Sequence, residues 1–376
     1  MKKFVSKLLV HVISFIFGIL LGVISAFYLA LWGWFADPIT LVEIFVSLIL
    51  SIFLATAIHE AGHLIFGLIS GYGFSSYRVG SLMLIKINGK LKLRTFKLAG
   101  TGGQCLMTPP EKKDGKYPYV LYNLGGAIIN LVTLVLCVIF LIDLWYLPFI
   151  SILLMYLALF SLCFAVLNGV PMHIGGLSND GMNAIYLGKD ELAIEAFMNQ
   201  LRMNAESVSG KSLSQMPDEW FEIPNGADMT NVSISSIAVF RTNRNFEKLD
   251  MQVSEEEIES LLKSGCNVVD IHKKLLICDL LVCKLFNDAH SSEIGRLLTN
   301  EQKKFMSSMK NFVSIIRTEY VIALLRDADE KKAEKLLAHF NKIAKNHPLE
   351  DGLATDKEIM RRAREKYESL KTSQIK

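Results

Sequence analysis

Four long apolar segments in the first half of the chain most constrain what it can fold into. They cover about residues 8–35, 39–70, 119–142 and 148–170. Each is long enough to cross a hydrocarbon layer of about 30 Å as a helix. The first is too long for the apolar core of a cleaved signal peptide, so we expect it to be retained. Half of all residues are hydrophobic (51%) and the mean hydropathy is +0.33, which favours a membrane-embedded part.

Basic residues are distributed unequally between the connections of these segments. The connection 71–117 holds nine Lys and Arg against two acidic residues, whereas the connections around 36–38 and Asp143 hold no Lys or Arg. Positive residues concentrate on the cytoplasmic side of membrane proteins, so we expect both termini and the connection 71–117 in the cytoplasm. The chain is thus predicted to be an integral, multi-pass protein of the lipid bilayer, and we expect a bacterial cell membrane.

The connection 71–117 has a β-prone sequence. Ser81–Ile87 and Leu91–Leu98 are apolar runs joined by Asn88-Gly89, which is a strong signal for a hairpin. A third short run, Gln104–Met107, follows a glycine-rich stretch. We expect a small sheet at the membrane surface, which either is purely structural or binds an extended substrate along an edge strand.

Residues 183–376 have the pattern of a soluble helical domain. Val268–Phe286, Asn311–Leu325 and Lys331–Ala344 carry apolar residues at intervals of three and four. The last of them resembles the second helix of a tetratricopeptide hairpin, although no regular period repeats. This half holds 28 basic and 30 acidic residues, so no nucleic-acid partner is expected. A protein partner stays open, because an apolar helical face is most often core.

The predicted fold class is therefore an all-α polytopic membrane protein with about four transmembrane helices and a small β insertion. Residues 1–182 are expected to form the membrane domain, and residues 183–376 a soluble helical cytoplasmic domain, for which a tetratricopeptide-like arrangement is one option. The six cysteines form no C-x-x-C pair, and we expect reduced thiols rather than disulfides or a cysteine metal site.

The second apolar segment carries the sequence His59-Glu60-Ala61-Gly62-His63 near its end. Two histidines four residues apart project from one face of a helix, so both can bind the same zinc ion. The intervening glutamate can take a proton from a zinc-bound water. Ionisable residues at membrane depth are costly and mark functional sites. The alternative is a set of polar residues that joins transmembrane helices.

Asp180 is the expected third ligand. A zinc peptidase site needs three protein ligands and one open position. The fourth apolar segment ends in Asn168–Pro171, and a helix broken at membrane depth is tolerated where it lines a cavity or is buried in protein. Asp180 follows this break on the same side as the two histidines. An Asp-Gly pair is also typical of a helix cap or a turn, and His173 is a rival ligand.

Together these motifs resemble the site-2 protease family of intramembrane zinc metalloproteases. In that family one transmembrane helix carries H-E-x-x-H and a later one carries an Asn…Pro…Asp-Gly signature; a Gly-x-x-x-Asn element, matched here by Gly126 to Asn130, often lies between them. The likeness covers about residues 39–182, although the spacing from Asn168 to Asp180 is longer than the family's. It implies the zinc ligands His59, His63 and Asp180, the general base Glu60, and a substrate cleft shaped by Asn130, Asn168 and Pro171.

The expected function is that of an intramembrane zinc endopeptidase, which cleaves a membrane-spanning or membrane-associated peptide near the cytoplasmic face. Such an enzyme serves regulated intramembrane proteolysis or the processing of a peptide precursor. One alternative is a membrane zinc peptidase with a downstream glutamate ligand, for which only Glu111 lies between the two motif-bearing segments. The other is a catalytically idle membrane receptor or immunity protein that acts through residues 183–376.

Overall fold

The computed structural model describes residues 2–32, 38–87, 89–95, 102–174, 177–345 and 353–375. Its contacts divide the chain into two compact units, Met1–Ile194 and Glu195–Lys376. The first unit extends past the expected boundary at 182/183, because the short helix α5 (Asp180–Tyr186) packs against the apolar helices. Each unit is described by itself.

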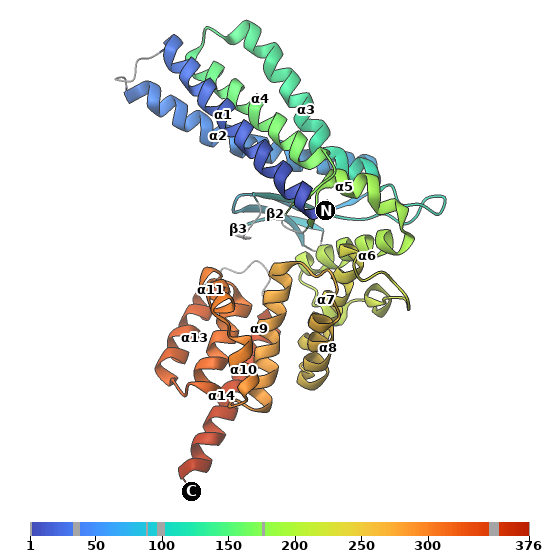
Figure 1. Ribbon diagram of the computed structural model, residues 1–376, viewed down its shortest axis with the longest axis vertical. Helices are drawn as coiled ribbons and strands as arrows, with labels where there is room; N and C mark the ends of the chain where they lie inside the picture. Colours follow the sequence, from blue (N-terminus) through green and yellow to red (C-terminus); the bar gives the residue numbers. More distant parts are fainter. Residues whose placement is uncertain are drawn as a thin grey trace. The chain divides into compact units, whose positions relative to one another are not determined.

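The first unit is built on four apolar helices (Figure 1). They are α1 (Lys2–Trp32), α2 (Pro38–Ile69), α3 (Tyr119–Leu144) and α4 (Pro148–Gly169). All four are long and apolar enough to cross a membrane. This confirms the four predicted segments as long apolar helices. The helices α2, α3 and α4 pack against one another, and α1 lies mainly on α4.

The side chains of this bundle are distributed in the way expected for a protein surrounded by lipid. Large apolar side chains such as Phe15, Phe45 and Ile142 are more than half exposed on its outside. The buried face of α2 instead carries small and polar residues at intervals of four, namely Ser47, Ser51, Ala55, His59 and His63. Small residues allow helices to approach closely, so the ionisable groups lie inside the bundle, where protein partners satisfy them.

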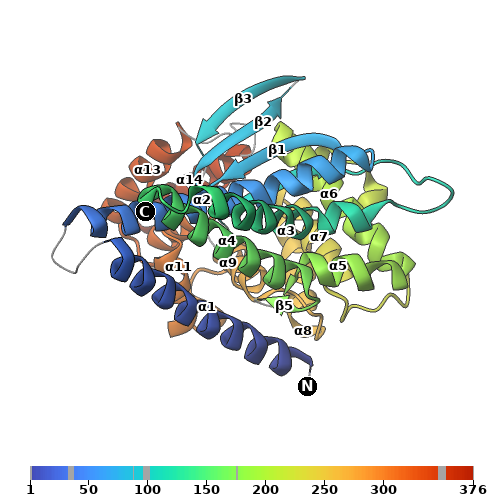
Figure 2. The ribbon, with the colours of Figure 1, turned by 90° about the horizontal axis from the view of Figure 1, so that it is seen from above.

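A four-stranded antiparallel sheet follows α2. Its strands are β1 (Gly73–Val79), β2 (Leu82–Ile87), β3 (Lys90–Thr95) and β4 (Gly103–Thr108), in the spatial order β3-β2-β1-β4. The predicted hairpin is confirmed as β2 and β3, in which Leu84 lies opposite Leu93; residues 88 and 96–98 lie outside the described part. Both β1 and β4 pack against α2, and Figure 2 shows β1 beside this helix. The edge strand nearest α2 is therefore β4, and β3 is the opposite edge.

A short connection returns the chain from the end of α4 to the bundle. The strands β5 (His173–Ile174) and β6 (Leu177–Ser178) pair as a small antiparallel ladder. The helix α5 then begins at Asp180 and packs against α3 and α4.

The second unit is helical. Its helices are α6 (Glu191–Ser209, which begins in the first unit), α7 (Val232–Glu247), α8 (Met251–Lys263), α9 (Asp270–Asn287), α10 (Ser292–Leu297), α11 (Asn300–Ser308), α12 (Val313–Val321), α13 (Glu330–Ala344) and α14 (Ala354–Ile375). The three helical stretches predicted from the sequence are confirmed as α9, α12 and α13. Their apolar faces meet in one core around Leu281, Ile316 and Phe340, which α14 joins through Ile359. All six cysteines of the chain are free thiols.

Candidate metal centre

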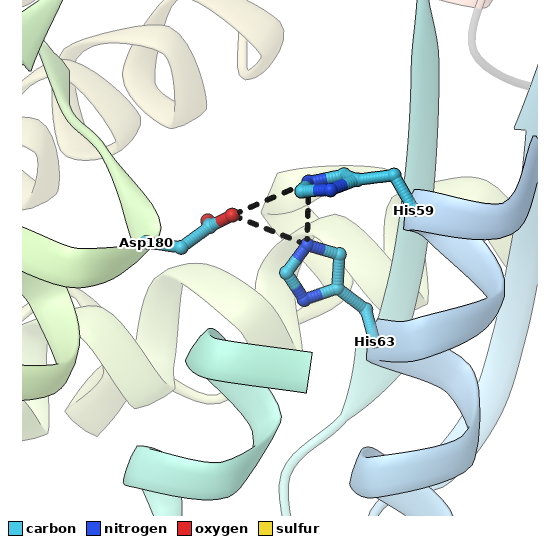
Figure 3. Close-up of side chains that lie close together, drawn as sticks. All are labelled: His59, His63 and Asp180. Carbon is cyan, nitrogen blue, oxygen red and sulfur yellow. Dashed lines mark hydrogen bonds and ion pairs between the residues drawn. The ribbon is translucent and has the colours of Figure 1, made fainter. Parts of the chain in front are cut away.

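The two histidines of the predicted motif lie one turn apart on α2 and are both buried. Their rings are nearly perpendicular, with centroids 4.9 Å apart. The Nε2 atoms of His59 and His63 are separated by 3.3 Å. Both imidazoles therefore direct the same nitrogen toward one point in the interior of the bundle (Figure 3).

Asp180 completes a group of three ligand atoms at this point. Its Oδ2 lies 3.4 Å from Nε2 of His59 and 3.3 Å from Nε2 of His63. In a tetrahedral site with bonds of about 2.0–2.1 Å, neighbouring ligand atoms are about 3.3–3.4 Å apart. The triangle of side chains thus fits a small tetrahedral ion and leaves the fourth position to an external ligand, so this group could hold a metal ion.

Hydrogen bonds to the other ring nitrogen set the orientation of both imidazoles. Nδ1 of His59 lies 2.7 Å from Oδ1 of Asn130, and Nδ1 of His63 lies 2.8 Å from the carbonyl oxygen of Tyr122. Both partners are acceptors, so each Nδ1 carries the hydrogen and each Nε2 presents its lone pair to the metal position. Asn130, which the family resemblance assigns to the substrate cleft, is fully buried behind His59 and supports it.

Glycines explain why Asn130 can reach His59. A Cβ atom at Gly126 would lie 2.4 Å from the His59 ring, and a Cβ atom at Gly125 would lie 2.5 Å from the Gly62 carbonyl oxygen. Only glycine at these positions lets α3 approach α2 so closely. Asn130 follows Gly126 by about one helical turn and therefore faces the same imidazole.

Glu60 is buried beside the three ligands but is not one of them. Its carboxylate accepts a hydrogen bond from the backbone N–H of Cys105 in β4. A Cβ atom at Gly103 would lie 2.6 Å from Oε1 of Glu60. The strand β4 therefore lies directly against the carboxylate, and the sequence alone did not predict this contact.

The remaining predicted residues differ in their relation to the site. Asp180 joins the two histidines, whereas His173 belongs to β5, where its Nδ1 lies 3.5 Å from Ser178 Oγ. Asn168 donates from Nδ2 to the Phe164 carbonyl oxygen of its own helix, at 3.0 Å. Pro171 is half-buried just after the end of α4. Asp180 is thus the residue that the structure brings to the histidines, while the described side-chain bond of Asn168 stays within α4.

Sequence reasoning missed Asn179, which immediately precedes Asp180. Its side chain caps α5 by accepting from the backbone N–H of Met182 at 2.9 Å. The signal was present in the sequence, because asparagine is among the preferred N-cap residues and precedes a helix here. Asn179 therefore makes the helix cap of this segment, and the adjacent Asp180 faces the two histidines.

Comparison of the chain with protein-family models, with curated proteins and with solved structures gave no significant match. The likeness to site-2 proteases therefore rests on the sequence motifs alone.

Proposed function

We propose that this chain is a zinc endopeptidase of the site-2 protease type, which hydrolyses a peptide bond of a membrane-spanning or membrane-associated substrate. The observation that carries the proposal is the convergence of His59, His63 and Asp180 at separations of 3.3, 3.3 and 3.4 Å. Glu60 lies beside this group, on a helix long and apolar enough to cross a membrane. Two imidazoles, one carboxylate and a neighbouring free carboxylate match the needs of hydrolysis by a metallopeptidase.

The donor set favours zinc over the common hard cations. Zinc takes nitrogen and oxygen ligands in tetrahedral sites, whereas magnesium and calcium prefer six or more oxygens. Bound zinc would polarise the scissile carbonyl and lower the pKa of the attacking water. The alternative ligand Glu111 is exposed and lies outside the group of three, which argues against a peptidase with a glutamate ligand.

In the proposed reaction Glu60 is the general base and then the general acid. Its carboxylate takes a proton from the attacking water and delivers it to the nitrogen of the leaving amine. His59 and His63 keep their Nδ1 hydrogens and donate them to Oδ1 of Asn130 and to the Tyr122 carbonyl oxygen throughout, so neither imidazole is needed for proton transfer.

The sheet supports a role in presenting the substrate. A peptide bond inside a helix has its carbonyl group hydrogen-bonded, so the substrate must unwind and its freed backbone groups need new partners. In the described part of the sheet β4 pairs only with β1, and it lies against Glu60. Because the backbone N–H and carbonyl of Cys105 in β4 are already bonded to Glu60 and to the Tyr122 hydroxyl, we assign strand addition to the exposed opposite edge, β3.

The proposal is tested with the full chain purified in detergent. We expect about one zinc ion per chain by elemental analysis. We also expect hydrolysis of a single-span membrane peptide that carries helix-breaking residues near its cytoplasmic end, followed by mass spectrometry of the products. Folded protein that holds no zinc after supplementation would overturn the proposal. Zinc-loaded protein that cleaves none of a series of such peptides would instead favour the idle receptor or immunity protein.

A further inference from the structure

Every polar atom of the Asn179 side chain is engaged in a hydrogen bond. Its Oδ1 accepts from the backbone N–H groups of Met172, at 3.0 Å, and Met182, at 2.9 Å. Its Nδ2 donates to the carbonyl oxygens of Leu167 and Val170, both at 2.6 Å. With only 8% of the residue exposed, these four bonds take the place of water.

These bonds connect three segments that are separate in the fold. The carbonyl groups in the last turn of a helix have no partner within the helix, and Nδ2 of Asn179 serves the Leu167 carbonyl at the end of α4. The same side chain caps the start of α5 and binds the chain just after the break, where the Asn179 backbone N–H also donates to the Met172 carbonyl at 3.1 Å. Asn179 therefore ties the beginning of α5 to the end of α4.

The residue after Asp180 is equally constrained. A Cβ atom at Gly181 would lie 2.1 Å from the Gly169 carbonyl oxygen, so α5 starts in direct contact with the backbone at the end of α4. Asp180 stands between two residues that are both held against α4. Its carboxylate consequently has little freedom to leave the position in which it faces His59 and His63.

We propose that Asn179 is a positioning residue that holds Asp180 at ligand distance from the two histidines. This inference rests on the metal site of the proposed function. It assigns the role to Asn179 and not to Asn168, whose side-chain amide bonds only within its own helix in the contacts described above. Residues that orient metal ligands typically contribute about 10–100-fold to metal affinity, and we expect an effect of that size.

The test compares Asn179→Asp with the matched change Asn168→Asp in the full chain. The Asn179→Asp side chain keeps the oxygen that caps α5 but loses both donors to α4. We expect its zinc affinity, measured by competition with a chelator, to fall about 10–100-fold. The visible spectrum of the cobalt-loaded protein should also change, because it reports ligand geometry. Asn168→Asp should leave both readouts within about twofold of the unchanged protein.

A second variant, Asn179→Ser, introduces no carboxylate, so a change in its zinc affinity cannot come from a new carboxylate ligand. It also replaces Asn179→Asp in the test if that variant does not fold. Serine is also a good N-cap, so α5 should persist while the two bonds to α4 are lost. Circular dichroism of the metal-free proteins checks that the fold is kept. Unchanged zinc affinity and an unchanged cobalt spectrum in the folded Asn179 variants would overturn this inference alone. Failure of the unchanged protein to bind zinc would overturn the proposed function and this inference with it.

Discussion

The carboxylates of Glu60 and Asp180 lie close together but have different surroundings. Asp180 faces two imidazole nitrogens, whereas Glu60 accepts the Cys105 N–H and lies against Gly103. Glutamine at position 60 retains the oxygen that accepts from Cys105, so it should preserve the local structure. It cannot take up a proton, which removes only the acid–base function.

We therefore expect Glu60→Gln to keep the fold and the metal while losing cleavage. The loss of a general base costs about 10²–10⁴ in rate. Zinc content and turnover of the same preparation are the two measurements. Near-normal turnover by zinc-loaded Glu60→Gln protein would exclude the proposed mechanism.

The identity of the third ligand is tested by Asp180→Ala, with His173→Ala as its control. Removing one of three ligands should lower the zinc content well below one ion per chain after dialysis. The His173 ring has its described contact with Ser178 in the β5–β6 ladder, so its removal should leave the zinc content unchanged. The reverse result would restore His173 as the ligand.

Only part of this centre could be predicted from the sequence. His59, Glu60 and His63 follow from helical periodicity, and Asp180 follows from a break in an apolar segment. Asn130 was named from the family resemblance as a cleft residue, but its contact with His59 was out of reach, because it depends on how two helices pack. The Tyr122 carbonyl that accepts from His63 was also out of reach, since a backbone carbonyl leaves no mark in a sequence.

At the scale of elements, the contact between β4 and α2 connects the sheet to the candidate general base. A Cβ atom at Gly103 would lie 2.6 Å from Oε1 of Glu60 and 2.9 Å from Thr56, whereas a Cβ atom at Gly102 would meet Thr56 at an ordinary 3.7 Å. Gly103→Ala should therefore displace the Glu60 carboxylate and lower the cleavage rate without removing zinc. Gly102→Ala is the matched control and should remain active. Equal activity of the two variants would show that Glu60 does not depend on β4.

The strand β1 was missed by the sequence analysis for a physical reason. Three of its residues, Ser75, Ser76 and Arg78, are polar and yet buried, so the alternation typical of a strand is absent. Arg78 donates from Nη1 to the Gly80 carbonyl at 2.8 Å and from Nη2 to the Gly103 carbonyl at 3.3 Å. Tertiary hydrogen bonds of this kind override the local pattern.

In the second unit, a buried ionic group joins α9, α12 and α14. Nη2 of Arg317 lies 2.5 Å from Oδ1 of Asp279, and its Nε lies 3.5 Å from Oδ1 of Asp356. Burial raises the pKa of Asp356 to about 6; Arg317 opposes this shift and Asp279 adds to it. Glu247 of α7 also lies within electrostatic range of Asp356. The folded unit thus holds a proton on Asp356 more tightly than an unfolded chain does, whose aspartate pKa is about 4.

The stabilising contribution of this proton is complete below about pH 4 and is lost as the pH rises through about 6. Between about pH 5 and 7 the change amounts to about 1 kcal/mol. Hydrogen exchange of α14 amides in the full chain, corrected for intrinsic rates, should therefore show easier opening at the higher pH. Asp356→Asn should reduce this dependence. If opening of α14 in Asp356→Asn depends on pH as strongly as in the unchanged protein, the dependence would be assigned to Asp279 or Glu247.

At the scale of the whole molecule, the constraint of a bilayer makes the helical part of the first unit predictable. Backbone groups in lipid must be satisfied within one helix, so four long apolar runs leave few alternatives. The short helix α5 escaped prediction because seven residues are too few for a periodic pattern. The division of the chain after Ile194 likewise depends on α5 packing against α3 and α4, which only the folded chain displays.

The last prediction concerns how the first unit crosses the membrane. If all four helices cross, α2 ends and α3 begins on the same side, and the nine basic residues of 71–117 predict that this side faces the cytoplasm. His63 precedes the end of α2 at Ile69 by six residues, about 9 Å along the helix, so the metal group should open to the cytoplasm. Reporter fusions should read outside, inside, outside and inside after Asp37, Lys97, Asp143 and Lys376. An outside reading after Lys97 would turn the metal group to the other face and remove the case for cleavage near the cytoplasm.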